Sequence, residues 1–210
     1  MKTSWGFSAL LLVAALTTST LVADSKIVYR WVLTGVPMPQ LKKVLVIAVL
    51  ENYLIRQEFE DEMERLLAKS GVEGIKSHMI LPPRNEVTEA ELRQRIKEST
   101  LDGVFVIRPK AVAKETDEVI VGGAYVPPPG YYSFWPYWHT AYSSYHSTSS
   151  YTRENTIVRA EFNLYNVKDE KLLWSGETDT VYSENFEKLG KDYARMLVKQ
   201  LKRDKVIGKQ

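Results

Sequence analysis

The chain has 210 residues, of which 28 are Lys or Arg and 26 are Asp or Glu, so its formal net charge at pH 7 is +2. A balance this close to neutral lacks the basic excess of a nucleic-acid-binding protein, and we expect no nucleic acid partner. The chain contains no cysteine, which excludes disulfides, thiolate metal sites and cysteine nucleophiles. Its length suits one domain with a sizeable core.

The first residues have the pattern of an export signal. Lys2 precedes an apolar run from Phe7 to Leu16, which is too short to span a bilayer, and small polar residues follow it. We therefore expect residues 1–23 to be a signal peptide. A cysteine-free exported protein fits the periplasm or an association with the bacterial cell envelope.

The end of this segment bears on lipid attachment. Leu21-Val22-Ala23 resembles the first three residues of a bacterial lipobox, in which Cys comes next. Here Asp24 stands in that place, and thioether lipidation needs a thiol. We expect an exported protein that carries no lipid. Residues 24–41 show no clear period and are expected to form a linker or an extended arm.

From residue 42 onward, strand and helix patterns alternate. Lys43–Leu50 is almost wholly apolar, which is typical of a strand buried on both faces. Asn52 can cap the following helix, which Gly71 ends. The apolar stripe of that helix comprises Ile55, Phe59, Met63, Leu66 and Leu67. Its dense acidic run, together with Arg56, is expected on the solvated side, so that Arg56 and Glu60 should be exposed.

Two further strands and a helix complete the first half. Val72–Leu81 is a predicted strand, and Thr88 with Glu91 forms a capping box at the start of a short helix. Leu101–Ile107 is a predicted strand that Pro109 closes. The order β-α-β-α-β favours parallel pairs with right-handed crossovers.

The second half changes pattern. Ala111–Val121 is a predicted strand, and Thr156–Tyr165 alternates between apolar and polar residues. A polar turn then leads into Leu172–Val181, which makes a hairpin, and a last helix runs from about Ser183 to about Arg203. The sequence therefore predicts an α/β domain over residues 42–205. We expect a single mixed sheet built from β-α-β-α-β, a long antiparallel hairpin and a C-terminal helix, with an aromatic, Pro-rich loop inserted at 122–152 and a tail at 206–210.

The aromatic insertion carries the functional prediction. No charged residue lies between Val119 and Thr152, and three prolines open the ring-rich part at Pro127. Amphipathic rings in a segment that interrupts its own secondary structure indicate an exposed contact surface. The predicted binding residues are Tyr131, Tyr132, Phe134, Trp135, Tyr137, Trp138, Tyr142 and Tyr145. They could stack on a glycan or meet a protein partner or a bilayer interface; alternatively, they cover a sheet face and contribute only stability.

Taken together, several elements resemble a known group of proteins. These are the exported leader, the KVLVIAV strand, the helix after Asn52, the strand LDGVFVIR, the aromatic insertion and a hairpin ending in LLWSGET. The arrangement resembles uncharacterised periplasmic and lipoprotein-like α/β proteins of bacteria. Their domain is similar to that of penicillin-binding-protein activator lipoproteins, the curli secretion component and the amino-terminal domain of the Tol translocation protein. The resemblance covers roughly Lys42 to Lys205 and implies an accessory or binding protein rather than a catalyst.

Little in the sequence indicates catalysis. His139 and His146 lack a nearby carboxylate in the sequence, so we expect no metal site and no cofactor. Glu161 within a strand is expected to pair with Arg108 or Arg159 rather than to act as an acid or base. We expect a non-catalytic accessory or binding protein of the cell envelope whose partner is an envelope protein or a glycan such as peptidoglycan. The alternatives are a secreted hydrolase or metal-dependent enzyme, or a subunit of an envelope secretion or assembly complex.

Overall fold

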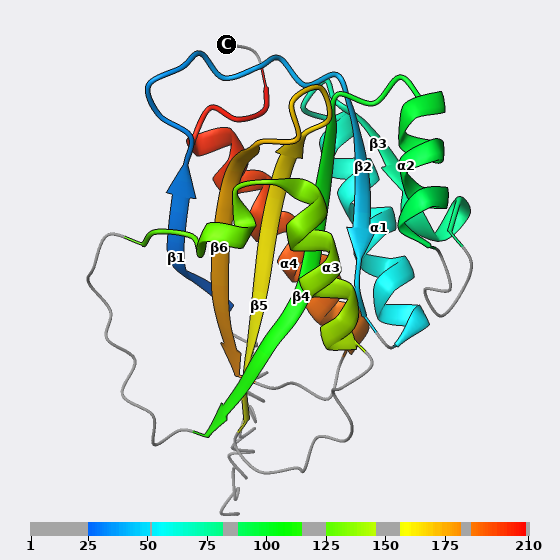
Figure 1. Cartoon of the computed structure of the whole chain (residues 1–210). Helices are drawn as coiled ribbons and strands as arrows, with labels where there is room; N and C mark the ends of the chain where they lie inside the picture. The colour runs from blue at the N-terminus through cyan, green and yellow to red at the C-terminus, as the bar shows by residue number, and fades with distance from the viewer. Residues whose placement is uncertain are drawn as a thin grey trace, which may run out of the picture.

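The computed structural model describes residues 25–50, 52–81, 88–114, 125–145, 156–181 and 186–208. They form a mixed α/β fold around one 6-stranded sheet, which confirms the predicted fold class (Figure 1). In chain order the elements are β1 (Lys26–Val32), β2 (Lys43–Ala48), α1 (Tyr53–Ala68), β3 (Glu73–Lys76), η1 (Ser77–Met79), α2 (Glu89–Glu98), β4 (Gly103–Lys114), η2 (Pro129–Tyr131), α3 (Phe134–Tyr145), β5 (Thr156–Asn166), β6 (Leu172–Val181) and α4 (Phe186–Arg203).

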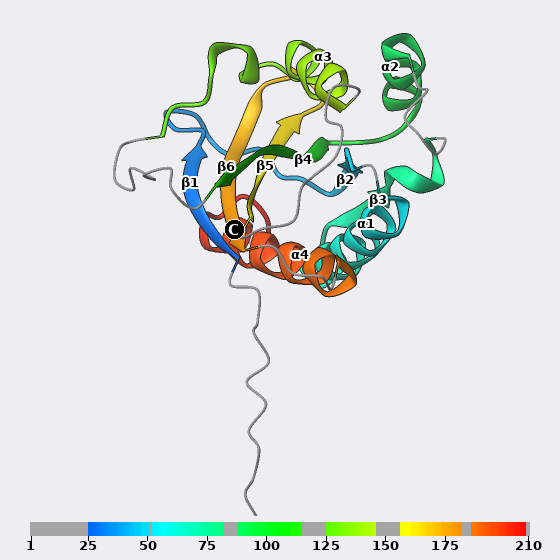
Figure 2. The ribbon, with the colours of Figure 1, turned by 90° about the horizontal axis from the view of Figure 1, so that it is seen from below.

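The sheet has the strand order β1-β6-β5-β4-β2-β3. Strand β2 lies parallel to both β3 and β4, while the β4–β5, β5–β6 and β1–β6 pairs are antiparallel. Helices α1 and α4 cover one face of the sheet, and α2 and α3 lie on the other, as the view from below shows (Figure 2). The result is three layers with a separate apolar cluster on each side of the sheet.

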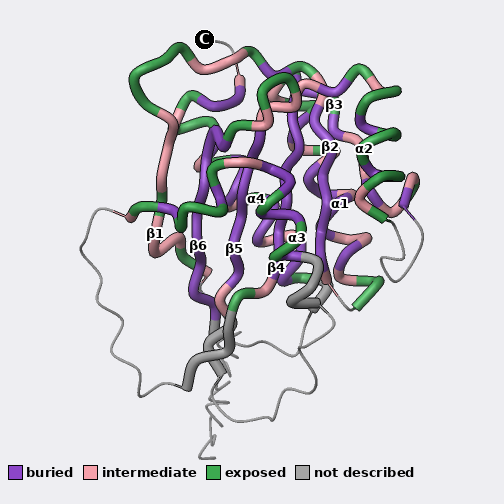
Figure 3. Tube along the Cα trace, in the orientation of Figure 1, coloured by how far each residue is buried: buried purple, intermediate pink, exposed green. Residues whose placement is uncertain are grey.

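Strand β2 shows why the centre of the sheet is apolar on both faces. Val44 and Val46 belong to the cluster beneath α1 and α4, whereas Leu45 and Ile47 belong to the cluster beneath α2 and α3. All four are buried. Figure 3 shows most of this strand in purple, which marks buried residues, and only Lys43 at its start is intermediate. The apolar run therefore predicted its environment correctly.

Helix α1 begins and ends where its sequence indicates. The Asn52 side chain accepts hydrogen bonds from the backbone N–H groups of Leu54 and Ile55, at 3.0 and 3.2 Å. Gly71 follows the helix with a φ of +77°, a conformation that glycine adopts without a Cβ clash. Phe59 and Met63 are fully buried against the sheet. The capping box of α2 is likewise present, with Thr88 and Glu91 bonding to each other's backbone N–H.

Two predicted strand boundaries were wrong. Strand β4 does not stop at Pro109 but continues to Lys114, with a register shift between Pro109 and Ala111. A bulge is one of the few places in a sheet that accepts a proline, because the ladder is already interrupted there. Strand β3 covers only Glu73–Lys76, and the chain then turns through η1. The part of the predicted strand Ala111–Val121 that lies beyond Lys114 is outside the described residues.

Within residues 24–41 the chain forms the edge strand β1, which pairs antiparallel with β6. Arg30 on β1 donates to Asp204, which follows α4, at 2.9 Å, and Trp174 on β6 donates to the same carboxylate at 2.8 Å. These bonds fix the edge strand to the layer behind it.

Among the described helices, none has both the length and the apolar character that a membrane span requires.

Candidate functional site

The aromatic segment is not the loop that was predicted, because Phe134–Tyr145 forms helix α3. Pro136 lies in its first turn, where the missing backbone N–H would have no partner within the helix. The start of the helix is held in place because the Phe134 N–H donates to the backbone carbonyl of Glu170 at 2.9 Å. Proline and aromatic residues therefore start this helix rather than break it.

Most of the predicted contact rings are buried, which corrects the expectation of an exposed surface. Tyr137 has no exposed area, and Trp138 is 3% exposed. Tyr132 is the exception, with 38% exposed, and it packs edge-on against Trp31 of β1 at 5.6 Å between ring centroids. The other buried members of the predicted set are Tyr131, Phe134 and Trp135. Tyr142 and Tyr145 lie on α3, but their side chains are outside the described residues.

The physical reason for this burial is a helical stripe within the aromatic run. Phe134, Trp138 and Ala141 recur at helical spacing, and all three belong to the core cluster between α3 and the sheet. The rings of Phe134 and Tyr137 both pack on Tyr165 of β5, with centroids 5.4 Å apart in each case. This spacing was the sequence signal that could have identified the helix. The density of rings at neighbouring positions concealed it.

Beneath α3 the sheet also presents charged residues, next to the apolar ones of the core cluster. The Arg108 Nε on β4 donates to Glu161 Oε1 on β5 at 2.9 Å, and both side chains are buried. The same guanidinium donates to the Tyr131 hydroxyl at 2.7 Å and to the Thr140 carbonyl of α3 at 3.4 Å. Asn163 donates to Glu161 Oε1 at 3.1 Å. The predicted pairing of Glu161 with Arg108 is confirmed, and it anchors α3 to the sheet.

A second buried carboxylate lies next to this pair. Glu177 on β6 stands directly opposite Glu161 in the strand register. It is bound by Lys110, which occupies the bulge of β4, and by the Tyr125 hydroxyl at 3.1 Å. Burial, followed by the nearby charges of Glu177 and Glu161, raises the pKa of Tyr125 far above its usual value. The phenol therefore stays protonated and donates.

A pocket of about 320 Å³ lies between α2 and the start of α3. Its apolar side is formed by Ile96, Val104, Phe134, Trp135, Tyr165 and Val167. Its polar side is formed by Arg93, Lys97, Asn166 and Glu170. The volume falls at the lower end of small-molecule sites, and the combination of aromatic faces with a few polar groups is characteristic of them. Three elements distant in sequence, α2, α3 and the β5–β6 turn, meet here.

Polar contacts fix the rim of this pocket. The Arg93 guanidinium lies 3.8 Å above the Trp135 ring, and the Trp135 indole donates to Glu170 at 2.9 Å. Arg93 also donates to Glu89 at 2.6 Å. His139 of α3 pairs with the same Glu89, so a carboxylate of α2 meets this histidine although none is near it in sequence. Helices α2 and α3 are thereby tied together along the pocket.

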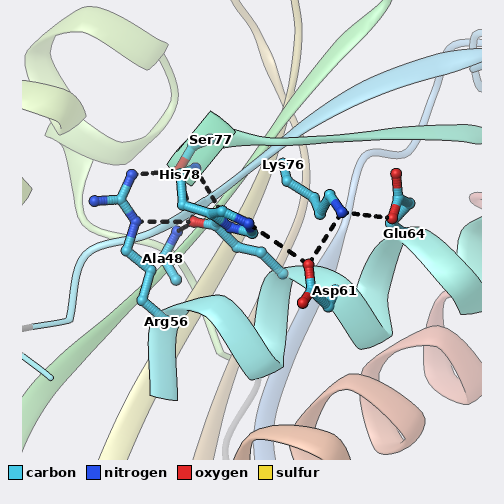
Figure 4. Close-up of polar contacts among 8 residues, drawn as sticks. Ala48, Arg56, Asp61, Glu64, Lys76, Ser77 and His78 are labelled. Carbon is cyan, nitrogen blue, oxygen red and sulfur yellow. Dashed lines mark hydrogen bonds and ion pairs between the residues drawn. The ribbon is translucent and has the colours of Figure 1, made fainter. Parts of the chain in front are cut away.

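A third polar cluster joins α1 to the ends of β2 and β3 (Figure 4). Glu60 was predicted to be exposed, but it has no exposed area and its carboxylate is saturated. Its Oε1 accepts from Ala48 N–H, Arg56 Nε and Ser77 Oγ, at 3.0, 3.2 and 2.6 Å. Its Oε2 accepts from the backbone N–H and the ring Nδ1 of His78, both at 2.8 Å. Arg56, also predicted to be exposed, is buried and donates to Ser77 at 2.9 Å.

The geometry of this cluster fits a structural role rather than a catalytic one. Ser77 donates its hydroxyl proton to Glu60 rather than to a histidine, so it lacks the nucleophile–base pairing of a hydrolase. The other ring nitrogen of His78, Nε2, lies 3.6 Å from the Asp61 carboxylate. Lys76 forms ion pairs with Asp61 and Glu64, at 3.1 and 3.0 Å. Across the described ranges, no group of three or more His, Asp or Glu side chains is arranged to hold a metal ion. That no metal is bound stays a prediction.

No known protein-family description matches the chain, and no curated protein matches it. Among solved structures, it is similar to the PelC dodecamer from Paraburkholderia phytofirmans, with 11% identity and a TM-score of 0.42 over 90% of this chain and 100% of that chain. A variant PelC dodecamer from the same organism gives 10% identity and a TM-score of 0.42 over 84% and 96% of the two chains. Similarities at this level indicate neither a ligand nor a partner for this chain.

Proposed function

We propose that this protein is a non-catalytic binding or accessory protein of the bacterial cell envelope, and that it contacts a glycan through the pocket between α2 and α3. The observation that carries this proposal is the pocket itself, in which Phe134 and Trp135 of the predicted aromatic segment meet a polar rim. The buried rings thus contribute the wall of a concave site instead of an open platform.

A glycan suits this pocket for two physical reasons. Sugar rings carry apolar C–H faces, which pack on surfaces such as those of Phe134 and Val167. They also carry hydroxyl groups, which can bond to Lys97, Asn166 and Glu170 at the rim. The small concave volume favours one sugar unit over a protein partner, since protein interfaces of standard size bury roughly 800 Å² on each side.

The state of the buried carboxylates supports binding over catalysis. A general acid or base must reach a proton of the substrate. Glu60 is enclosed by five donors, and Glu161 and Glu177 are buried and paired with Arg108 and Lys110. Among the described residues, the opposed Glu161 and Glu177 favour the hydrolase alternative, because acid–base pairs often use two carboxylates. Their burial keeps them from an external substrate.

The envelope location rests on the sequence. Residues 1–23 lie outside the described residues, and their charged, apolar and small-residue regions are the pattern of an export signal. Asp24 in place of a lipobox cysteine indicates that the mature protein is not lipidated.

Binding to isolated glycans tests the proposal. Val167→Phe should fill the pocket, and Lys97→Ala should remove a rim donor that is exposed and contributes little to stability. Each should weaken binding to peptidoglycan fragments or to a panel of soluble envelope polysaccharides by roughly tenfold or more, which is about 1.4 kcal/mol. Arg95→Ala is the matched control, because Arg95 is exposed on the same helix but does not line the pocket.

Three results would contradict the proposal in different ways. Equal binding by the wild type and both pocket variants would mean that the glycan binds elsewhere. Retention of a single protein from envelope extract, with no binding to any polysaccharide, would favour the protein-partner alternative. Turnover of a glycan by the wild type would favour the hydrolase.

A further inference from the structure

The polar groups that line the pocket between α2 and α3 are not equivalent. They comprise two cations, Arg93 and Lys97, one carboxylate, Glu170, and the amide of Asn166. A bound sugar can use only those donors and acceptors that the protein itself leaves unused. The contacts of each group therefore indicate which kind of sugar the pocket accepts.

Arg93 is engaged by the protein on three sides. Its guanidinium lies 3.8 Å from the centroid of the Trp135 ring, donates to Glu89 at 2.6 Å and lies 3.7 Å from the Glu170 carboxylate. Glu170 in turn accepts from the Trp135 indole at 2.9 Å. The charges of Arg93 and Glu170 thus offset each other, and both groups hold the wall of the pocket.

Lys97 lies one turn further along α2, four residues after Arg93, so the two cations share one side of the helix. The residues three and four positions away from Lys97 are Arg93, Gln94, Thr100 and Leu101, and none of them is acidic. Lys97 is exposed, and it forms no ion pair with any residue of the ranges that the structure describes. It therefore leaves a positive charge of the pocket unneutralised, with ammonium donors that a ligand can use.

Asn166 adds a further donor to the same pocket. Its Oδ1 accepts from the Lys168 backbone N–H at 3.2 Å, which leaves the NH2 group as the part of the amide that is open to a ligand. The floor of the pocket is apolar and includes Val104 and Val167. Beside this floor, the groups that remain for a ligand are an ammonium and an amide NH2, and both only donate.

We propose that the pocket selects sugar units that carry a carboxylate, as uronic acids do, over neutral sugars. The carboxylate binds Lys97 and the Asn166 amide, while a C–H face of the sugar ring packs on the apolar floor. A carboxylate only accepts, which matches two groups that only donate, whereas a hydroxyl in its place would leave its own proton without an acceptor. Charge-assisted hydrogen bonds are also roughly twice as strong as neutral ones. This inference rests on the proposed function, because it names the class of glycan that the same pocket binds.

Matched pairs of oligosaccharides test this selection. Oligomers of galacturonic, glucuronic and mannuronic acid are each compared with the same oligomer after reduction of its carboxyl groups to alcohols, which preserves length and linkage. In calorimetric titrations, at least one acidic oligomer should bind the wild type roughly tenfold more tightly than its reduced partner. Added salt should shrink this ratio, because Lys97 is exposed and its charge is screened.

Variants with a matched control assign the selection to the pocket. Lys97→Gln removes the charge at nearly constant length and should abolish the preference for the acidic oligomer, while Lys97→Arg should keep most of it. Asn166→Asp retains the oxygen that accepts from the Lys168 N–H but adds a carboxylate to the pocket, so the reduced oligomer should now bind more tightly. Arg95→Gln is the control, because it loses the same charge in the last turn of α2 without lining the pocket.

The outcomes separate this inference from the proposed function. Equal binding of every acidic oligomer and its reduced partner would overturn the selection for carboxylates and leave the glycan pocket intact. Equal loss of the preference in Lys97→Gln and Arg95→Gln would also overturn it, because the preference would then arise from overall charge. Binding of peptidoglycan fragments that Val167→Phe weakens, with no binding of any uronate oligomer, would overturn the selection alone. Absence of binding to every glycan, charged or neutral, would overturn both.

Discussion

The carboxylate of Glu60 accepts two hydrogen bonds from the same residue, His78, one from its backbone N–H and one from its ring Nδ1, each at 2.8 Å. This pair fixes the chain directly after β3 against the middle of α1. The second oxygen of Glu60 holds Ala48 at the end of β2. One carboxylate therefore joins a helix to the carboxyl ends of two parallel strands (Figure 4).

Removal of this carboxylate should be strongly destabilising. Glu60→Ala leaves Arg56 buried without its anionic partner, a change that typically costs about 3–5 kcal/mol. Denaturant unfolding followed by far-UV circular dichroism measures the loss. Glu58→Ala is the matched control on the same helix, because Glu58 pairs with Lys191 at the surface, and it should change stability by about 1 kcal/mol or less. Similar losses in the two variants would show that Glu60 does not act as a buried anchor.

The aromatic helix should be part of the folded core rather than a removable attachment. Trp138→Ala deletes a ring that is 3% exposed and should destabilise the protein by about 3–5 kcal/mol. Thermal unfolding measures this loss. Tyr132→Ala, at a ring that is 38% exposed, should have a much smaller effect. Deletion of residues 127–150 with full retention of stability would contradict the burial of α3.

The features that the sequence predicted correctly are those determined by neighbouring residues in the chain. The apolar run of β2 and the capping box of Thr88 and Glu91 depend on neighbouring residues, and both were predicted correctly. The environment of Glu60 depends instead on Ser77 and His78, which are 17 and 18 positions away. An acidic residue on an amphipathic helix is usually solvated, so only the tertiary structure could place this one in the interior.

The site was predictable only in part, for the same reason. The aromatic run correctly indicated an unusual segment. Because aromatic residues also occupy the positions between those of the helical stripe, the periodicity of α3 could not be recognised in the sequence. The pocket required Arg93 of α2 and Glu170 of the β5–β6 turn to meet Trp135. No spacing in the sequence relates these positions. In β4, the bulge at Lys110 let the strand pass Pro109, which local rules treat as a stop.

Acid should weaken the contact between α1 and α4 through Glu62. A hydrogen bond from Arg65, and further the charge of Arg195 on α4, lower the pKa of Glu62 below its ordinary value of 4.5. The group therefore stabilises the fold fully above that value, and this contribution is lost as the pH falls through its lower folded-state pKa. Urea midpoints between pH 6 and pH 3 should fall less steeply for Glu62→Gln than for the wild type. Parallel profiles would refute the assignment.

Export should remove the N-terminal segment without adding lipid. From the apolar run Phe7–Leu16 and from Asp24, we expect the mature chain to start near Asp24. Intact-mass measurement of protein purified from the native host would give the corresponding unmodified mass. Retention of Met1–Ala23, or added acyl mass, would disprove this expectation.

The edge strand β1 also sets an order for the assembly of the domain. Its Arg30 and the Asp204 that holds it are 174 positions apart, and β6, its partner in the described sheet, lies in the last third of the chain. Closing so long a loop carries an entropic cost before any contact repays it, so β1 is expected to dock late in folding. The contact between Arg30 and Asp204 cannot form before residue 204 has been synthesised. The edge strand therefore gains its last anchoring contact only after the final residues of the chain have emerged.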